Sequence, residues 1–387
     1  MKKQIAMRYL ALASIVASLA TATPSFAQHN ATDPSLGTSG RFQMSGANFP
    51  ACLLQTPQAD RKKCLEPLPT GLVSDEELAA VHIRRAKLLL WDYQQPIGAE
   101  AEAEVDAALR ATPNSADVLH FAARLTLHLH SYPPSPPHIQ KGAAQINAAL
   151  AQQPNDVALR NTLAHYAIAQ KQPAVAFKLL SDILKDKPDD LAALTTRSVL
   201  FVQNNAHEAA VEDLNRALIV TPNNPKLRLQ RASVLNSLAR PSDAIADLDV
   251  VLSDDKMKHD IEARMTRATA YRQLGNFELA VKDMSYIIDG PGNGQKYVPL
   301  PPHMQSGLVM QRGMAYFKLG RTADAMRDIE TSVTHKGTQH ILKLQITLRQ
   351  HGYSAVKIDG KLSDQVRDAL QACFAAAECG EVITSRL

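Results

Sequence analysis

Aromatic residues are scarce in this chain: they make up 5% of its 387 residues, with a single tryptophan, Trp91. The sequence also lacks the signatures of common enzyme classes, namely a GxSxG elbow, an HExxH zinc motif, a phosphate-binding P-loop and a GxGxxG turn after a strand. No basic tract is present, which argues against a nucleic-acid partner. We therefore expect a protein that is not an enzyme and needs no cofactor.

The residues that are abundant point to a folded, helical protein. Apolar residues make up 45% of the chain and charged residues 21%, as in ordinary globular proteins. Alanine and leucine supply most of the apolar surface, and both favour helices.

The first 27 residues are typical of a secretory signal peptide. Lys2, Lys3 and Arg8 precede an apolar run over residues 9–20, and residues 25–27 form a small–x–small cleavage site. A membrane anchor is the alternative, but spanning a bilayer takes about 20 apolar residues and this run is shorter. Cleavage would remove three basic residues and no acidic one, so the net charge would fall from +4 to +1. We expect an exported bacterial protein, periplasmic or secreted, with no membrane span after cleavage.

Four cysteines fall as two pairs that are close in sequence, Cys52 with Cys64 and Cys373 with Cys379. Three pairings are open, and in an oxidising compartment we favour the two local disulfides. Cys373 and Cys379 are too far apart within one continuous helix to be bridged, so a helix there must end between them. A zinc site would need CxxC-like spacings, which are absent.

A period of 34 residues runs through the middle of the chain, set by Pro154, Pro188 and Pro222. A small residue follows ten positions after each of these prolines, and another small residue follows twelve positions later. Two further units, 268–280 and 313–325, share the pattern small–xx–Tyr–xx–Leu–Gly–xxxx–Ala. Small residues allow two helices to cross closely, and a glycine after Leu favours the left-handed end of a helix. The prolines would stop the helix before them.

This pattern resembles the tetratricopeptide repeat, in which two helices pair and successive pairs stack. The resemblance implies an all-α fold, a right-handed α-solenoid of about seven helix pairs; the alternative is an irregular helical bundle. Five repeats are clear, near 157–190, 191–224, 225–260, 261–294 and 306–336, and two degenerate pairs precede them, near 75–112 and 116–153. We expect a signal peptide over 1–27, a linker or N-terminal cap over 28–73, the repeat solenoid over 74–336 and a further module over 338–387.

The last fifty residues break the repeat and resemble a peptidoglycan-binding-type module, a small three-helix unit. The match rests on three short motifs, LQxxL, GY and IDG, whose residues are Leu344, Gln345, Leu348, Gly352, Tyr353, Ile358, Asp359 and Gly360. The stretch after IDG departs from the family pattern. We expect Leu344, Leu348 and Ile358 in the core, Gly352 at a helix end, and Asp359 in a turn where it caps the helix after it. Glycan binding is left open, since a fold does not fix a function.

The resemblance also implies a groove for a protein or peptide, lined by the first helix of each repeat. The fifth, ninth and twelfth positions of these helices would face it: Asn161, His165, Ile168, Thr195, Val199, Val202, Leu229, Ser233, Asn236, Met265, Thr269, Arg272, Met310, Met314 and Phe317. The methionines and Phe317 would form an adaptable apolar stripe, or would instead pack against the C-terminal module or the loop over residues 290–303. Asn161 matches the family's carboxylate clamp in type, but the lysine partners are missing, so we expect an amphipathic helix or extended peptide.

Four histidines lie within nineteen residues, His120, His128, His130 and His138, and we place His138 in a proline-rich loop. No carboxylate or cysteine lies at ligand spacing beside them, so we expect exposed or half-buried histidines and no metal site. Carboxylates such as Asp247 and Asp249 are expected on exposed helix faces.

Together these features predict a scaffold in the cell envelope that binds a partner protein, with a tether to peptidoglycan as one option. The alternatives are an accessory regulator of a cell-wall enzyme and an assembly chaperone without wall contact.

Overall fold

The computed structural model describes residues 74–90, 98–130, 135–291, 301–376, 379–380 and 382–383. The regular structure of these residues is entirely helical, and none of their helices is long and apolar enough to cross a membrane. The expected signal peptide, the N-terminal cap and the Cys52–Cys64 pair lie outside the described residues. The chain divides into two compact units, residues 1–193 and 194–387.

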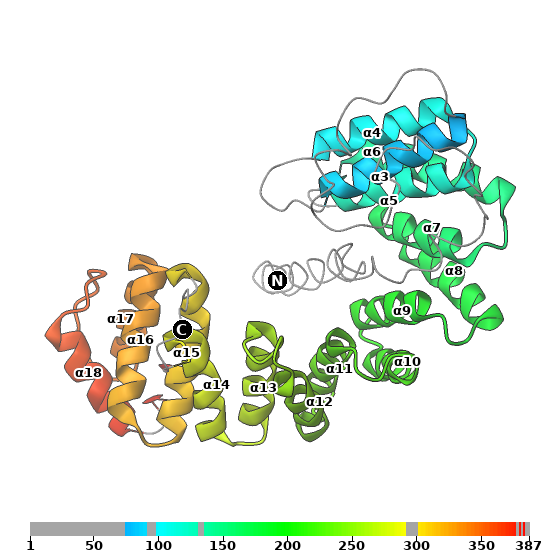
Figure 1. Cartoon of the computed structure of the whole chain (residues 1–387). Helices are drawn as coiled ribbons and strands as arrows, with labels where there is room; N and C mark the ends of the chain where they lie inside the picture. Colours follow the sequence, from blue (N-terminus) through cyan, green and yellow to red (C-terminus); the bar gives the residue numbers. More distant parts are fainter. Residues whose placement is uncertain are drawn as a thin grey trace. The chain divides into compact units, whose positions relative to one another are not determined.

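Unit 1 contains three helix pairs, which follow one another as packed neighbours (Figure 1). The helices are α3 (Asp75–Leu90), α4 (Gly98–Ala111), α5 (Ala116–His130), α6 (Pro136–Gln152), α7 (Val157–Ala169) and α8 (Pro173–Asp186).

Unit 2 contains the rest of the array and the C-terminal segment. Its helices are α9 (Leu191–Gln203, which begins at the end of unit 1), α10 (His207–Val220), α11 (Pro225–Ser237), α12 (Pro241–Ser253), α13 (Ile261–Gln273), α14 (Phe277–Asp289), α15 (Pro302–Lys318), α16 (Thr322–Lys336), α17 (Thr338–Gln350) and α18 (Asp364–Ala375). The described helices from α3 to α16 make seven pairs, so the predicted all-α repeat solenoid is confirmed.

Local signals set the ends of these helices. Pro154, Pro188 and Pro222 lie two residues beyond the ends of α6, α8 and α10. Gly275 and Gly320 adopt φ values of 76° and 72° directly after the first helix of their repeats, the left-handed ends that the sequence predicts. The same position is left-handed in the three preceding repeats, where the residue is not glycine.

Small residues bring the two helices of a repeat close together. Ala164, Ala176 and Ala232 have no exposed surface, and the alanines at the corresponding positions of the later repeats are at most 3% exposed. Gly313 shows how tight the crossing is, since a Cβ there would lie 3.1 Å from the Cβ of Asp328 and 3.2 Å from the Ala325 carbonyl oxygen.

A ladder of buried ion pairs links the helices of unit 2, with one rung in each of its four repeats. In every rung an arginine of the first helix donates two hydrogen bonds to an aspartate sixteen residues later: Arg197–Asp213, Arg231–Asp247, Arg267–Asp283 and Arg312–Asp328, with Nε–Oδ2 distances of 2.7 to 2.8 Å. The aspartate side chains are at most 6% exposed. The expectation that Asp247 lies on an exposed face is therefore wrong. Because an isolated buried charge is costly, each aspartate depends on its arginine.

Three of the arginines also contact the second helix of the preceding repeat. Arg231 donates to Asn215, Arg267 to Asp249 and Arg312 to Ser285, over 2.7 to 3.1 Å. Each of these rungs thus fixes both the pairing within a repeat and the stacking on its neighbour.

The C-terminal helices share a core with the last repeat. Met310 and Ile329 lie in one buried cluster with Leu344, Leu348 and Leu370. A disulfide joins Cys373 to Cys379, and α18 ends at Ala375, so the helix ends between the two cysteines as predicted. This segment is therefore packed onto the array and stapled at its far end.

The side chain of Gln345 holds the IDG turn. It is fully buried, donates to Asp359 Oδ1 (2.9 Å) and the Lys361 carbonyl (2.8 Å), and accepts from the backbone N–H groups of Asp359 and Gly360. Gly352, with φ 95°, follows the end of α17, in agreement with its expected role.

Two expectations for this segment are wrong. Ile358 is 48% exposed, because Val356, which is 1% exposed, occupies the core position in this stretch. Asp359 accepts from the Lys361 N–H within the turn, but the N-cap of α18 is Ser363, so Asp359 does not cap that helix.

Candidate partner-binding surface

In unit 1 one of the predicted groove residues, Asn161, already has a hydrogen-bond partner. Asn161 is buried and donates to Asp190 Oδ1 (3.0 Å), which also accepts from the Ala193 N–H at the start of α9. Ile168 and His165, further along α7, are half-buried. Asn161 therefore joins α7 to the start of α9.

Two histidines of unit 1 have strongly lowered pKa values. Burial lowers the pKa of His165 to about 4, and the positive charge of Arg124 adds to this effect. His120, at the equivalent position to Asn161 one repeat earlier, also has a pKa of about 4, lowered by burial and by Arg124 and opposed by Asp156. Its Nε2 lies 2.9 Å from Thr162 Oγ1. Both histidines are therefore neutral at pH 7.

At the start of unit 2 the predicted positions vary in exposure. Ser233 is exposed, whereas Leu229 and Asn236 are buried, and Thr195, Val199 and Val202 are half-buried. Asn236 donates to the Thr266 carbonyl of α13 over 2.9 Å. Like Asn161, Asn236 ties one first helix to the next.

A hollow of about 320 Å³ opens between α13, the start of α14 and α15. We call it the α13–α15 hollow; its lining residues are Thr269, Arg272, Gln273, Phe277, Met314, Ala315 and Lys318. Three of them, Thr269, Arg272 and Met314, are predicted groove residues from two successive repeats. Arg272 Nη1 donates to Gln311 Oε1 (2.9 Å), and although burial lowers its pKa, arginine remains charged at neutral pH.

The sequence did not identify the other four lining residues. Gln273 and Lys318 occupy the last positions of their helices, one residue beyond the twelfth position, and Phe277 begins α14. Including the thirteenth position of each first helix would have identified both Gln273 and Lys318.

The apolar stripe is divided between this hollow and the core. Met310 is 5% exposed and lies within the cluster shared with the C-terminal helices. The ring of Phe317 packs on Phe374 of α18 with centroids 4.9 Å apart. Met265, at 42% exposed, is the open member of the set. For Met310 and Phe317 the structure thus selects packing against the C-terminal segment.

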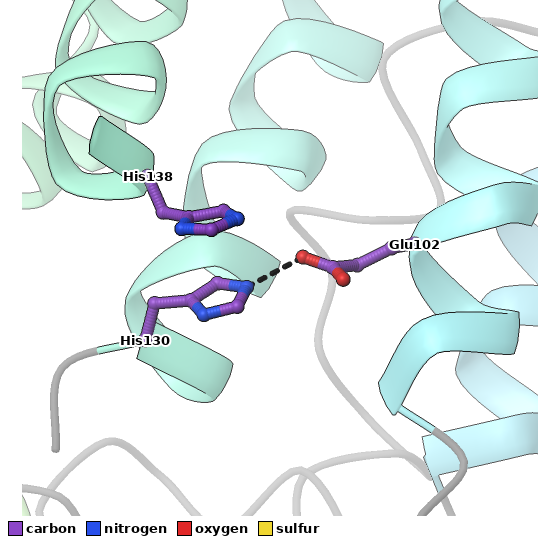
Figure 2. Close-up of side chains that lie close together, drawn as sticks. All are labelled: Glu102, His130 and His138. Carbon is purple, nitrogen blue, oxygen red and sulfur yellow. Dashed lines mark hydrogen bonds and ion pairs between the residues drawn. The ribbon is translucent and has the colours of Figure 1, made fainter. Parts of the chain in front are cut away.

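In a separate cluster in unit 1, two of the four histidines, His130 and His138, lie beside the carboxylate of Glu102. His130, the last residue of α5, places Nε2 2.6 Å from Oε1 of Glu102 on α4. The ring of His138 stacks on that of His130, with centroids 3.8 Å apart, and both rings turn an edge toward Glu102 (Figure 2). His138 belongs to the first turn of α6, not to a loop as expected. The sequence missed Glu102 because it lies 28 residues before His130.

Comparisons with known proteins agree with the repeat register. Residues 161–226 match the tetratricopeptide repeat family model. The 58 kDa phosphoprotein of Plasmodium berghei is 31% identical over 114 residues, 29% of this chain and 26% of that protein. A DnaJ homolog subfamily C member 7 homolog of Schizosaccharomyces pombe is 28% identical over 141 residues, 35% of this chain and 29% of that protein. The chain thus spans less than a third of the length of either relative.

Two solved structures resemble parts of the chain. A tetratricopeptide repeat protein from Parabacteroides merdae is 19% identical and has a TM-score of 0.44 over 65% of this chain and 98% of its own. The pilF protein of Pseudomonas aeruginosa is 16% identical, with a TM-score of 0.45 over 55% of this chain and 91% of its own. Residues 161–226 thus match the tetratricopeptide repeat family, and the repeated helix pairs of the described residues agree with that match.

Proposed function

We propose that this protein is a non-catalytic scaffold that binds a partner protein or peptide through the α13–α15 hollow. The observation that carries the proposal is the convergence of predicted groove residues from two successive repeats, Thr269, Arg272 and Met314, on one open hollow. Repeat arrays use the surface of their first helices in this way.

The lining of the hollow suggests the chemistry of its partner. Phe277, Met314 and Ala315 offer an apolar surface, while Arg272 and Lys318 bring two positive charges. None of the described residues that line the hollow is acidic. A segment that presents an apolar side chain next to an acidic one would match both features. Methionine adapts its shape readily, so several apolar side chains would fit.

Selection from a random peptide library displayed on phage tests this proposal. We expect the full chain to enrich peptides that pair an apolar residue with Asp or Glu, and Arg272→Glu to reduce their binding at least tenfold. Ser233→Glu is the matched control, because Ser233 is an exposed groove position outside the hollow. Equal loss in both variants, or no enrichment, would contradict the assignment.

We also propose that the scaffold works in the bacterial cell envelope. The support is the signal-peptide pattern of residues 1–27 together with the Cys373–Cys379 disulfide, since disulfides persist in oxidising compartments. N-terminal sequencing of the protein recovered from a periplasmic extract should begin at Gln28. Recovery of the uncleaved chain from the cytoplasm would refute export.

A tether to peptidoglycan is a second proposal, supported by the way Gln345 joins the LQ and IDG motifs. The exported chain should then pellet with purified peptidoglycan, and soluble peptidoglycan fragments should release it. Gln345→Ala, which removes the four hydrogen bonds to the turn, should weaken pelleting. Pelleting would favour a scaffold or regulator that works beside wall enzymes. If the chain does not pellet, an assembly chaperone without wall contact is favoured.

A further inference from the structure

Three metal-ligating side chains converge in unit 1 from three different helices. They are Glu102 of α4, His130 at the end of α5 and His138 in the first turn of α6, and their donor atoms all lie within 4.8 Å of one another. Because α5 packs against both α4 and α6, the cluster rests on adjoining rigid elements (Figure 2).

Hydrogen bonds already orient the two imidazole rings. His130 Nε2 points at Glu102 Oε1 over 2.6 Å. The Nδ1 atom of His138 lies 2.6 Å from Ser135 Oγ, which leaves Nε2 of His138 as the nitrogen available to a ligand. In metal-binding histidines, a hydrogen bond from the ring nitrogen that does not bind the metal usually fixes the orientation of the ring.

We propose that Glu102, His130 and His138 form a binding site for a divalent transition metal ion, with zinc as the ion of best fit. Two imidazole nitrogens and one carboxylate oxygen are donors that zinc accepts, at about 2.0–2.2 Å, whereas calcium and magnesium prefer oxygen alone. Three protein ligands leave a fourth tetrahedral position for water.

Binding requires only movements of side chains. Tetrahedral ligand atoms at those bond lengths lie about 3.3–3.5 Å apart. His130 Nε2 and Glu102 Oε1, now 2.6 Å apart, must therefore separate as the metal ion enters between them. The stacked rings must also rotate apart, so that both Nε2 lone pairs meet at one point. His138 is exposed, which gives the ion a path from solvent. Once bound, the metal would join α4, α5 and α6 and raise the stability of unit 1 by mass action.

The chain contains its own matched control. His82 Nδ1 lies 2.6 Å from Glu104 Oε2 on the same helix as Glu102, yet no second histidine completes a metal cluster there among the described residues. His82→Gln therefore removes a histidine–glutamate pair of the same kind without touching the proposed ligands.

Calorimetric titration of the chelator-treated full chain with Zn²⁺ tests the site. We expect one tight site per chain, an affinity at least tenfold lower in His138→Gln and in Glu102→Gln, and an unchanged affinity in His82→Gln. Zinc should raise the melting temperature of the parent and of His82→Gln by several degrees, and leave that of His138→Gln unchanged.

Circular dichroism of the metal-free variants shows whether each variant keeps the helical content of the parent. His138 is exposed, so its variant should fold like the parent, and a loss of zinc binding with unchanged helicity then reports on the site. Binding that is equal in the parent and His138→Gln, or no tight binding in the parent, would overturn the proposal. Co²⁺ in place of zinc should show the visible absorption of a four-coordinate ion in the parent, and not in His138→Gln.

Discussion

At the scale of single residues, Gly142 of α6 lies directly against the side chain of Tyr166 of α7. The side chain of Tyr166 is buried, and its hydroxyl group donates a hydrogen bond to the Ala123 carbonyl (2.6 Å). A Cβ at Gly142 would overlap that hydroxyl group. The ring has no room to move because it is fully buried. We predict that Gly142→Ala lowers the free energy of unfolding by about 2–3 kcal/mol, measured by urea denaturation.

Gly307 provides the control for this substitution. It lies on an exposed face within α15, and a Cβ there would meet no atom within 4 Å. Since alanine is the better helix former, Gly307→Ala should raise the free energy of unfolding by about 0.5–1 kcal/mol. A loss of similar size in both variants would show that contact with Tyr166 is not the cause.

The left-handed residue that follows the first helix in five of the repeats gives a second prediction at this scale. Gly275 has φ 76° and a Cβ there would meet no atom within 4 Å, so Gly275→Ala changes the backbone energy alone and should cost about 1 kcal/mol. Ala239 has φ 55° at the equivalent position two helices earlier. Ala239→Gly should therefore leave stability unchanged or raise it by up to about 1 kcal/mol, because relief of strain opposes the added chain entropy. Destabilisation by Ala239→Gly in thermal melts would refute this account.

At the scale of helices, the ion-pair ladder of unit 2 makes each rung vulnerable to loss of one partner. Arg197 donates two hydrogen bonds to Asp213, whose side chain is 3% exposed. Asp213→Ala would leave Arg197 without its carboxylate in a largely buried position. We predict a loss of about 3–5 kcal/mol in the free energy of unfolding, seen as a lower urea midpoint.

One repeat of the chain has two leucines in place of the arginine and aspartate of a rung. In the repeat before α9, Leu163 and Leu179 occupy the positions that Arg197 and Asp213 hold one repeat later. The double variant Arg197→Leu with Asp213→Leu should therefore be clearly more stable than Asp213→Ala, because no buried charge is left unpaired. A double variant as unstable as the single one would mean that the rung contributes more than charge compensation.

At the scale of the whole molecule, the sequence predicted what is encoded locally and missed what is encoded across helices. Pro154 and Gly275 act on their own backbone, so the helix ends and the repeat register could be predicted from them. The partners of Asp247 and His130 lie 16 and 28 residues away, on other helices. The Arg–Asp spacing recurs in four repeats and could have been found by aligning them, but nothing near the histidines in sequence indicates Glu102.

Acid sensitivity is expected to begin in unit 1, where His120 and His165 stay neutral in the folded chain. Their pKa values of about 4 lie below the ordinary 6.5, chiefly through burial and then through the charge of Arg124, while Asp156 opposes the shift at His120. Between pH 6.5 and 4 the unfolded chain therefore binds more protons than the folded chain, and stability falls as the pH is lowered. At pH 5 each histidine should cost about 2 kcal/mol relative to pH 7.5.

Urea midpoints at pH 7.5 and pH 5 measure this loss, and the double variant His120→Gln with His165→Gln supplies the comparison. Glutamine does not titrate, so the double variant should lose much less stability over the same interval, and hydrogen exchange should place the difference in α5 and α7. His128, whose pKa is also lowered by burial, accounts for part of the slope that remains. An equal fall in both proteins would mean that protonation elsewhere drives acid unfolding, and that these two histidines are as accessible to protons in the folded chain as in the unfolded one.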